Sequence, residues 1–254
     1  MTSVSHQNRS RQIEFDSSSR WLFATYLWFT RIMNPQAQDR TCAIAPAWHT
    51  CVLLLILAAP AGISIGMKMG HTHAKLGHLP SYSIAIVFEW AAFAFSLWHS
   101  DAAFAGYVAR VLHNPRSLLW DIPVALLLIA VLLLASPVIV HILGQTGWFS
   151  TKGMLPKGGV EVVAWVVAAL SAAICEETVY RGYFQQQISG WTGHLTFGVI
   201  GQAIIFGLAH GYQGWKNMVL ISVWGCIFGI FACLRKGLRT NMIAHAAIDI
   251  AAAF

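Results

Sequence analysis

An uninterrupted apolar run from Leu118 to Leu143 places the tightest limit on how this chain can fold. It contains one acidic residue, Asp121, and no lysine or arginine. About 20 apolar residues suffice for a helix to cross the hydrocarbon core of a bilayer. Inside lipid every backbone polar group needs an internal partner, which restricts spanning structures to helices and closed barrels. The run therefore predicts a transmembrane helix.

Further apolar runs of similar character flank this one on both sides. We predict an all-α polytopic transmembrane bundle of about seven spans, within a range of six to eight. The expected spans are His49–Met67, Ser81–Trp98, Leu118–Leu143, a run starting at Val160, Leu195–His210, Met218–Leu234 and Met242–Phe254.

The composition agrees with a protein that is surrounded by lipid. Hydrophobic residues make up 57% of the chain and charged residues only 10%, whereas soluble domains carry about 25% charged residues. The net charge of +6 does not indicate a nucleic-acid partner, because the basic residues lie between the apolar runs. The five cysteines include no CxxC pair, so we expect neither a disulfide framework nor a cysteine metal site.

Residues 1–48 form a polar arm, in which Trp21–Ile32 is apolar but too short to span. We expect this segment to be an amphipathic helix on the membrane interface. Loop charge sets the orientation of the bundle. With the N-terminus in the cytoplasm and seven spans, ten basic residues fall on the cytoplasmic side and five on the other. The former are Arg9, Arg11, Arg20, Arg31, Arg40, Arg110, Arg116, Arg235, Lys236 and Arg239, and the latter are Lys68, Lys75, Lys152, Lys157 and Lys216.

Ionisable residues inside membrane spans are costly and suggest function. In the sequence Glu176-Glu177-Thr178-Val179-Tyr180-Arg181, Glu177 and Arg181 have the i,i+4 spacing of a favourable ion pair. Glu176 is rotated by about 100° from Glu177, so the same arginine cannot easily serve both. Glu176 would remain available beside an apolar wall, where it can act as a general base.

Two histidines on later apolar runs complete this set. His210 ends the fifth predicted span, and His245 shares a helix face with Asp249 in the seventh. If the turn between spans four and five lies at residues 190–193, Glu176 and His210 lie roughly 22 and 27 Å from it. They would then face each other at similar depth. His245 lies roughly 10 Å beyond the turn between spans six and seven.

Three motifs in this order, EExxxR, FxxxH and HxxxN/D, resemble those of the type II CAAX protease and bacteriocin-processing (CPBP, or Abi) family. The resemblance covers about residues 160–254, with Phe206 opening the second motif. It implies a glutamic-type intramembrane endopeptidase, so that residues 159–254 would be the catalytic core and 49–158 variable transmembrane helices.

The resemblance also implies a role for each motif residue. Glu176 and His210 would activate the attacking water, Glu177 and Arg181 would support them, and His245 would stabilise the oxyanion. Asp249 stands at the N/D position. An ionised aspartate cannot donate a hydrogen bond, so Asp249 would orient His245 and favour its charged form.

Other interpretations use the same chain differently. Glu176, His210 and His245 could instead hold a zinc ion with an open water position. Glu89, Asp121 and His141 would support a transporter, although no inverted repeat is visible, and a catalytically idle scaffold is a further alternative. The loop histidines His71, His73 and His78 invite a metal interpretation as well.

We therefore predict an intramembrane endopeptidase that needs no cofactor. Its partners would be the lipid bilayer and a membrane-anchored or lipidated protein substrate. We expect it in a bacterial cytoplasmic membrane with a cytoplasmic N-terminus.

Overall fold

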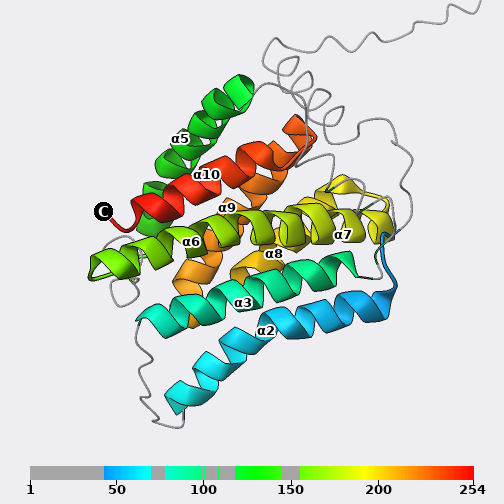
Figure 1. Ribbon diagram of the computed structural model, residues 1–254. Helices are drawn as coiled ribbons and strands as arrows, with labels where there is room; N and C mark the ends of the chain where they lie inside the picture. Colours follow the sequence, from blue (N-terminus) through cyan, green and yellow to red (C-terminus); the bar gives the residue numbers. More distant parts are fainter. Residues whose placement is uncertain are drawn as a thin grey trace, which may run out of the picture. The chain divides into compact units, whose positions relative to one another are not determined.

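The computed structural model (Figure 1) describes residues 43–69, 78–98, 118–144 and 155–254, together with residues 100, 104 and 108. Side chains are described throughout these ranges except at 61–69 and 118. The chain divides into a unit of residues 1–36 and a unit of residues 37–254, and every described residue belongs to the second. The interfacial helix expected at Trp21–Ile32 lies outside the described residues.

The described residues form helices and no strands, which confirms the predicted all-α fold. The helical elements are α2 (Ala47–Met69), α3 (His78–Leu97), α5 (Leu118–Ile142), α6 (Gly159–Glu176), η1 (Glu177–Phe184), α7 (Gln185–Thr192), α8 (Leu195–Ala209), η2 (Gly211–Gln213), α9 (Trp215–Arg235) and α10 (Arg239–Ala251).

Each of the seven predicted spans corresponds to a helix, but the helices differ in length. Four are long and apolar enough to cross a membrane: His78–Leu97, Leu119–Ile142, Gly159–Thr192 and Trp215–Arg235. α2 has 23 residues, which is within the length range of a membrane span. α8 and α10 have only 15 and 13 residues, so neither reaches the length of a full span on its own.

Large apolar side chains on the outside of α5 show what surrounds the bundle. Leu126 is 60% exposed, Leu133 51% and Leu134 75%. Apolar surface of this extent is rare on soluble monomers and marks contact with a membrane or a partner. The helix lengths and the exposed leucines together define an integral membrane protein.

The longest helical stretch contains a local irregularity. α6, η1 and α7 follow one another without a break (Figure 1), and Gly193 ends the stretch in the left-handed conformation with φ +71°. A regular α-helix was expected here, but residues 177–184 form a π-helix whose eight residues are all buried. A π-helix is rare and frequently occurs at functional sites.

Neighbouring helices surround the α6–η1–α7 stretch. α3 packs against one side of α6, and α10 packs against the other side. α10 also packs against α5 (Figure 1). Behind them α8 lies against α9 at very close range. A Cβ atom added to Gly207 of α8 would come within 2.5 Å of the Met218 carbonyl oxygen of α9. Small residues let membrane helices approach in this way.

A charged cluster fixes the start of α10. Asp121 of α5 pairs with Arg235 of α9, at 2.7 Å, and with Arg239 of α10. It also accepts a hydrogen bond from Thr240, at 3.1 Å. Asp121 was a candidate for a transport pathway, but it joins three helices instead.

Candidate active site

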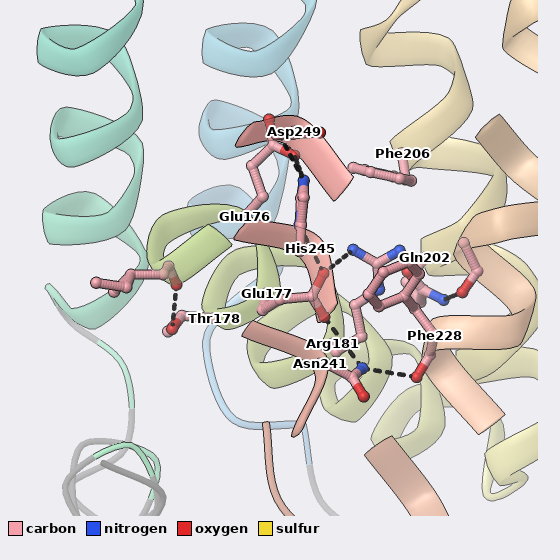
Figure 2. A network of polar contacts seen from close by, with 12 residues as sticks. Glu176, Glu177, Thr178, Arg181, Gln202, Phe206, Phe228, Asn241, His245 and Asp249 are labelled. Carbon is pink, nitrogen blue, oxygen red and sulfur yellow. Dashed lines mark hydrogen bonds and ion pairs between the residues drawn. The ribbon is translucent and has the colours of Figure 1, made fainter. Parts of the chain in front are cut away.

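Glu177 lies at the centre of a buried polar network (Figure 2). Its Oε1 accepts hydrogen bonds from Arg181 Nη1 at 2.8 Å and from His245 Nδ1 at 3.1 Å. Its Oε2 accepts from Asn241 Nδ2 at 3.1 Å. The side chains of Glu177 and Arg181 are both 0% exposed. The ion pair expected from the i,i+4 spacing is therefore present and fully desolvated.

The Arg181 guanidinium is held between two aromatic rings. Its central carbon lies 4.2 Å from the Phe206 ring centre and 4.9 Å from that of Phe228. The faces of such rings attract a cation. The Nε and Nη2 atoms are buried and have no hydrogen-bond partner among the described residues. Glu177 is therefore the acceptor that neutralises this arginine.

His245 points its two ring nitrogens in different directions. The Nδ1 atom faces the Glu177 carboxylate, which accepts a hydrogen bond, so Nδ1 carries a proton. Nε2 lies 3.7 Å from Glu176 Oε2 and 3.4 Å from Asp249 Oδ2. Asp249 thus stands beside His245, where it can orient the ring, as the motif implies.

His210 has a defined tautomer as well. Its Nδ1 lies 2.8 Å from the carbonyl oxygen of Phe206 one turn earlier. A carbonyl oxygen only accepts, so Nδ1 carries the proton, and Nε2 of the neutral ring keeps its lone pair. The Tyr212 ring stacks on the imidazole with the ring centres 5.9 Å apart. His210 is therefore held in a form that can accept a proton at Nε2.

These side chains meet at one cavity of about 360 Å³. Glu176, His210, His245 and Asp249 all line it, whereas Glu177 and Arg181 do not. The Glu176 side chain is 20% exposed, against 0% for Glu177. The two adjacent glutamates therefore differ in access: one faces the cavity and the other is sealed behind its wall.

Most of the remaining wall is apolar. It includes alanines of α6 and the rings of Trp165, Trp224 and Phe228. The Trp165 indole N–H donates to the Asp249 carbonyl oxygen at 2.7 Å, which joins α6 to the end of α10 beside the polar groups. An apolar cavity with a few convergent polar groups is typical of a binding site.

The histidines outside this site do not form a metal site at the cavity. No group of three His, Cys, Asp or Glu side chains in the described part of the chain is arranged to hold a metal ion. His78 lines the cavity but pairs with Glu161 at 2.9 Å. His71 and His73 lie outside the described residues. His141 is exposed on α5, away from the cavity lining.

Two residues of this site were missed in the sequence. Asn241 is 0% exposed, and besides Glu177 it donates to the Phe228 carbonyl oxygen at 2.8 Å. It precedes His245 by four residues on α10, and this helical spacing could have revealed it. Glu89 was weighed only for transport, yet it lines the same cavity.

Comparison with known proteins gives a family match for the C-terminal part of the chain. The helical bundle and its desolvated carboxylate–histidine network define an integral membrane protein with a buried polar site. Residues 158–251 match the family model of the Rce1-like type II CAAX prenyl endopeptidases. This match confirms the resemblance of the three motifs and supports an intramembrane protease in general terms. No curated protein and no solved structure gave a match.

Proposed function

We propose that the protein is an endopeptidase that hydrolyses a peptide bond of a membrane-anchored or lipidated protein within the membrane. One observation carries the proposal: Glu176, His210 and His245 line a single apolar cavity, while the adjacent Glu177 is buried in an ion pair. A carboxylate with access to the cavity and two histidines of fixed tautomer supply the groups that peptide hydrolysis needs.

The reaction begins with a water molecule between Glu176 and His210. Glu176 takes a proton from the water as the oxygen attacks the scissile carbonyl carbon, and His210 Nε2 accepts the second hydrogen bond of the water. His245 Nε2 donates to the developing oxyanion when its ring is protonated. The C–N bond then breaks, and Glu176 returns its proton to the leaving amine. The products are a carboxylic acid and an amine.

Glu177, Arg181 and Asn241 act behind the cavity wall. Glu177 fixes the direction of His245 through Nδ1, and its own charge is balanced by Arg181. Asn241 holds the second oxygen of Glu177. These residues position His245 and do not touch the substrate.

The apolar wall and the exposed apolar surface favour a substrate that arrives from the bilayer. The family acts on prenylated CAAX proteins, so a lipidated peptide is the first probe. The excess of basic residues in the N-terminal arm and in the loops on its side supports a cytoplasmic N-terminus.

The test uses purified protein in liposomes with a fluorogenic farnesylated CAAX peptide, its unlipidated twin and a transmembrane peptide. Glu176→Gln should lower the cleavage rate at least about 100-fold, the usual scale for loss of a general base. Glu161→Gln is the matched control: it removes a carboxylate from the same helix that is not part of the cavity lining, and its amide oxygen can still accept the hydrogen bond from His78. The proposal would be refuted if the wild type cleaved none of the three probes, or if Glu176→Gln kept full activity.

A further inference from the structure

Glu89 of α3 brings a third carboxylate to the cavity from outside the family-matched segment. It is the last of five α3 residues, at spacings of one helix face, that line the cavity: His78, Ser81, Tyr82, Ala85 and Glu89. Glu176, His245 and Asp249 line the same cavity. Glu89 therefore faces the reacting groups from the wall that α3 supplies.

Glu89 Oε2 is buried and makes no hydrogen bond to any described residue. A buried acceptor without a donor is unfavourable, so a polar atom left in this state at a cavity wall suggests that a ligand completes it.

The two other carboxylates of the cavity lie near one histidine ring. Asp249 Oδ2 is 3.4 Å and Glu176 Oε2 is 3.7 Å from His245 Nε2. A peptide that enters an apolar cavity brings backbone N–H groups, each of which needs an acceptor once water is removed. Two buried acceptors of the cavity lining have no hydrogen-bond partner among the described residues, Glu89 Oε2 and Gln213 Oε1, and Glu89 is the carboxyl group of the two.

We propose that Glu89 is a substrate-binding residue whose carboxyl group accepts a hydrogen bond from a backbone N–H next to the scissile bond. This inference rests on the proposed peptidase function. It assigns Glu89 to recognition of the peptide main chain, so Glu89 should affect how tightly the substrate binds.

The test measures binding in protein that cannot cleave. In the Glu176→Gln background, a labelled farnesylated CAAX peptide is titrated against protein in liposomes. Adding Glu89→Leu removes the acceptor and should raise the Kd about 5- to 100-fold. Adding Glu89→Gln keeps a carbonyl acceptor and should leave the Kd within about threefold. Ser83→Leu, at an exposed site on α3, controls for a new leucine on this helix.

The same peptide, N-methylated at one backbone nitrogen at a time, identifies the donor. Methylation at one position should weaken binding by the factor seen with Glu89→Leu, and should have no further effect in that variant. If Glu89→Leu does not fold, the methylated series on Glu176→Gln protein decides alone. Unchanged Kd for Glu89→Leu, or for every methylated peptide, would overturn the assignment of Glu89 and leave the peptidase proposal intact. Absence of binding of the farnesylated peptide, its unlipidated twin and the transmembrane peptide to the Glu176→Gln protein would overturn both.

Discussion

Replacing Glu177 by glutamine tests whether this residue has a structural role distinct from that of Glu176. Three donors converge on Glu177, from Arg181, Asn241 and His245. A glutamine has a single acceptor oxygen and cannot serve all three. It also leaves the Arg181 guanidinium, at 0% exposure, without a counter-charge.

The expected cost follows from what is lost. Breaking a buried ion pair by removing one partner costs about 3–5 kcal/mol. In a chain of this size, 1 kcal/mol shifts the melting temperature by about 2–4 °C. Glu177→Gln should therefore melt about 6–20 °C below the wild type, whereas Glu176→Gln, at the cavity surface, should melt within a few degrees of it.

The arginine offers a second route to the same pair. Arg181→Met keeps an apolar stem between the Phe206 and Phe228 rings but leaves the Glu177 carboxylate unpaired. It should be destabilised to a similar degree. The double variant should be less destabilised than the sum of the two single variants, because the second change removes the charge that the first left unpaired.

The assay compares melting temperature and cleavage of one peptide for each purified variant in the same detergent. Glu177→Gln should lose stability first and activity as a consequence, while Glu176→Gln should be folded and inactive. A stable but inactive Glu177→Gln beside an active Glu176→Gln would reverse the assignment of the two glutamates. Additive losses in the double variant would refute the pairing.

Three further predictions concern packing, helix positioning and metal dependence. Gly207→Ala should cost about 1–3 kcal/mol by forcing α8 and α9 apart, while Gly159→Ala, with nothing within 4 Å of its new Cβ, should melt like the wild type. Asp121→Asn leaves Arg235 and Arg239 without their carboxylate; we expect a loss of about 1–3 kcal/mol and a lower cleavage rate, because α10 carries His245. Cleavage should survive strong chelation, and activity lost on chelation and restored by zinc would favour the zinc mechanism instead.

The helices could be predicted from the sequence because apolar runs report directly on lipid exposure. The pairing of Glu177 with Arg181 could be predicted for a related reason, since both residues lie on one helix and their spacing fixes their geometry. The π-helix at residues 177–184 could not be predicted. Hydropathy does not show whether a backbone N–H bonds to the carbonyl oxygen four or five residues earlier.

Contacts between distant helices were harder to foresee. Glu89 and Asn241 reach the site from α3 and α10. The sequence around each of them does not indicate which helix packs against it. Asp121 looked like a transport residue for the same reason: its partners Arg235 and Arg239 lie more than 100 residues away. The close approach of α8 and α9 at Gly207 likewise depends on the partner helix.

We propose that Glu176 makes this chain a protease of membrane proteins. Its most direct test compares the membrane proteomes of cells that produce the wild type or Glu176→Gln at equal levels. The account predicts that one or a few membrane-anchored proteins accumulate in a longer, uncleaved form only in the variant. Identical sets of protein termini in the two membranes, with both proteins folded and equally abundant, would contradict it.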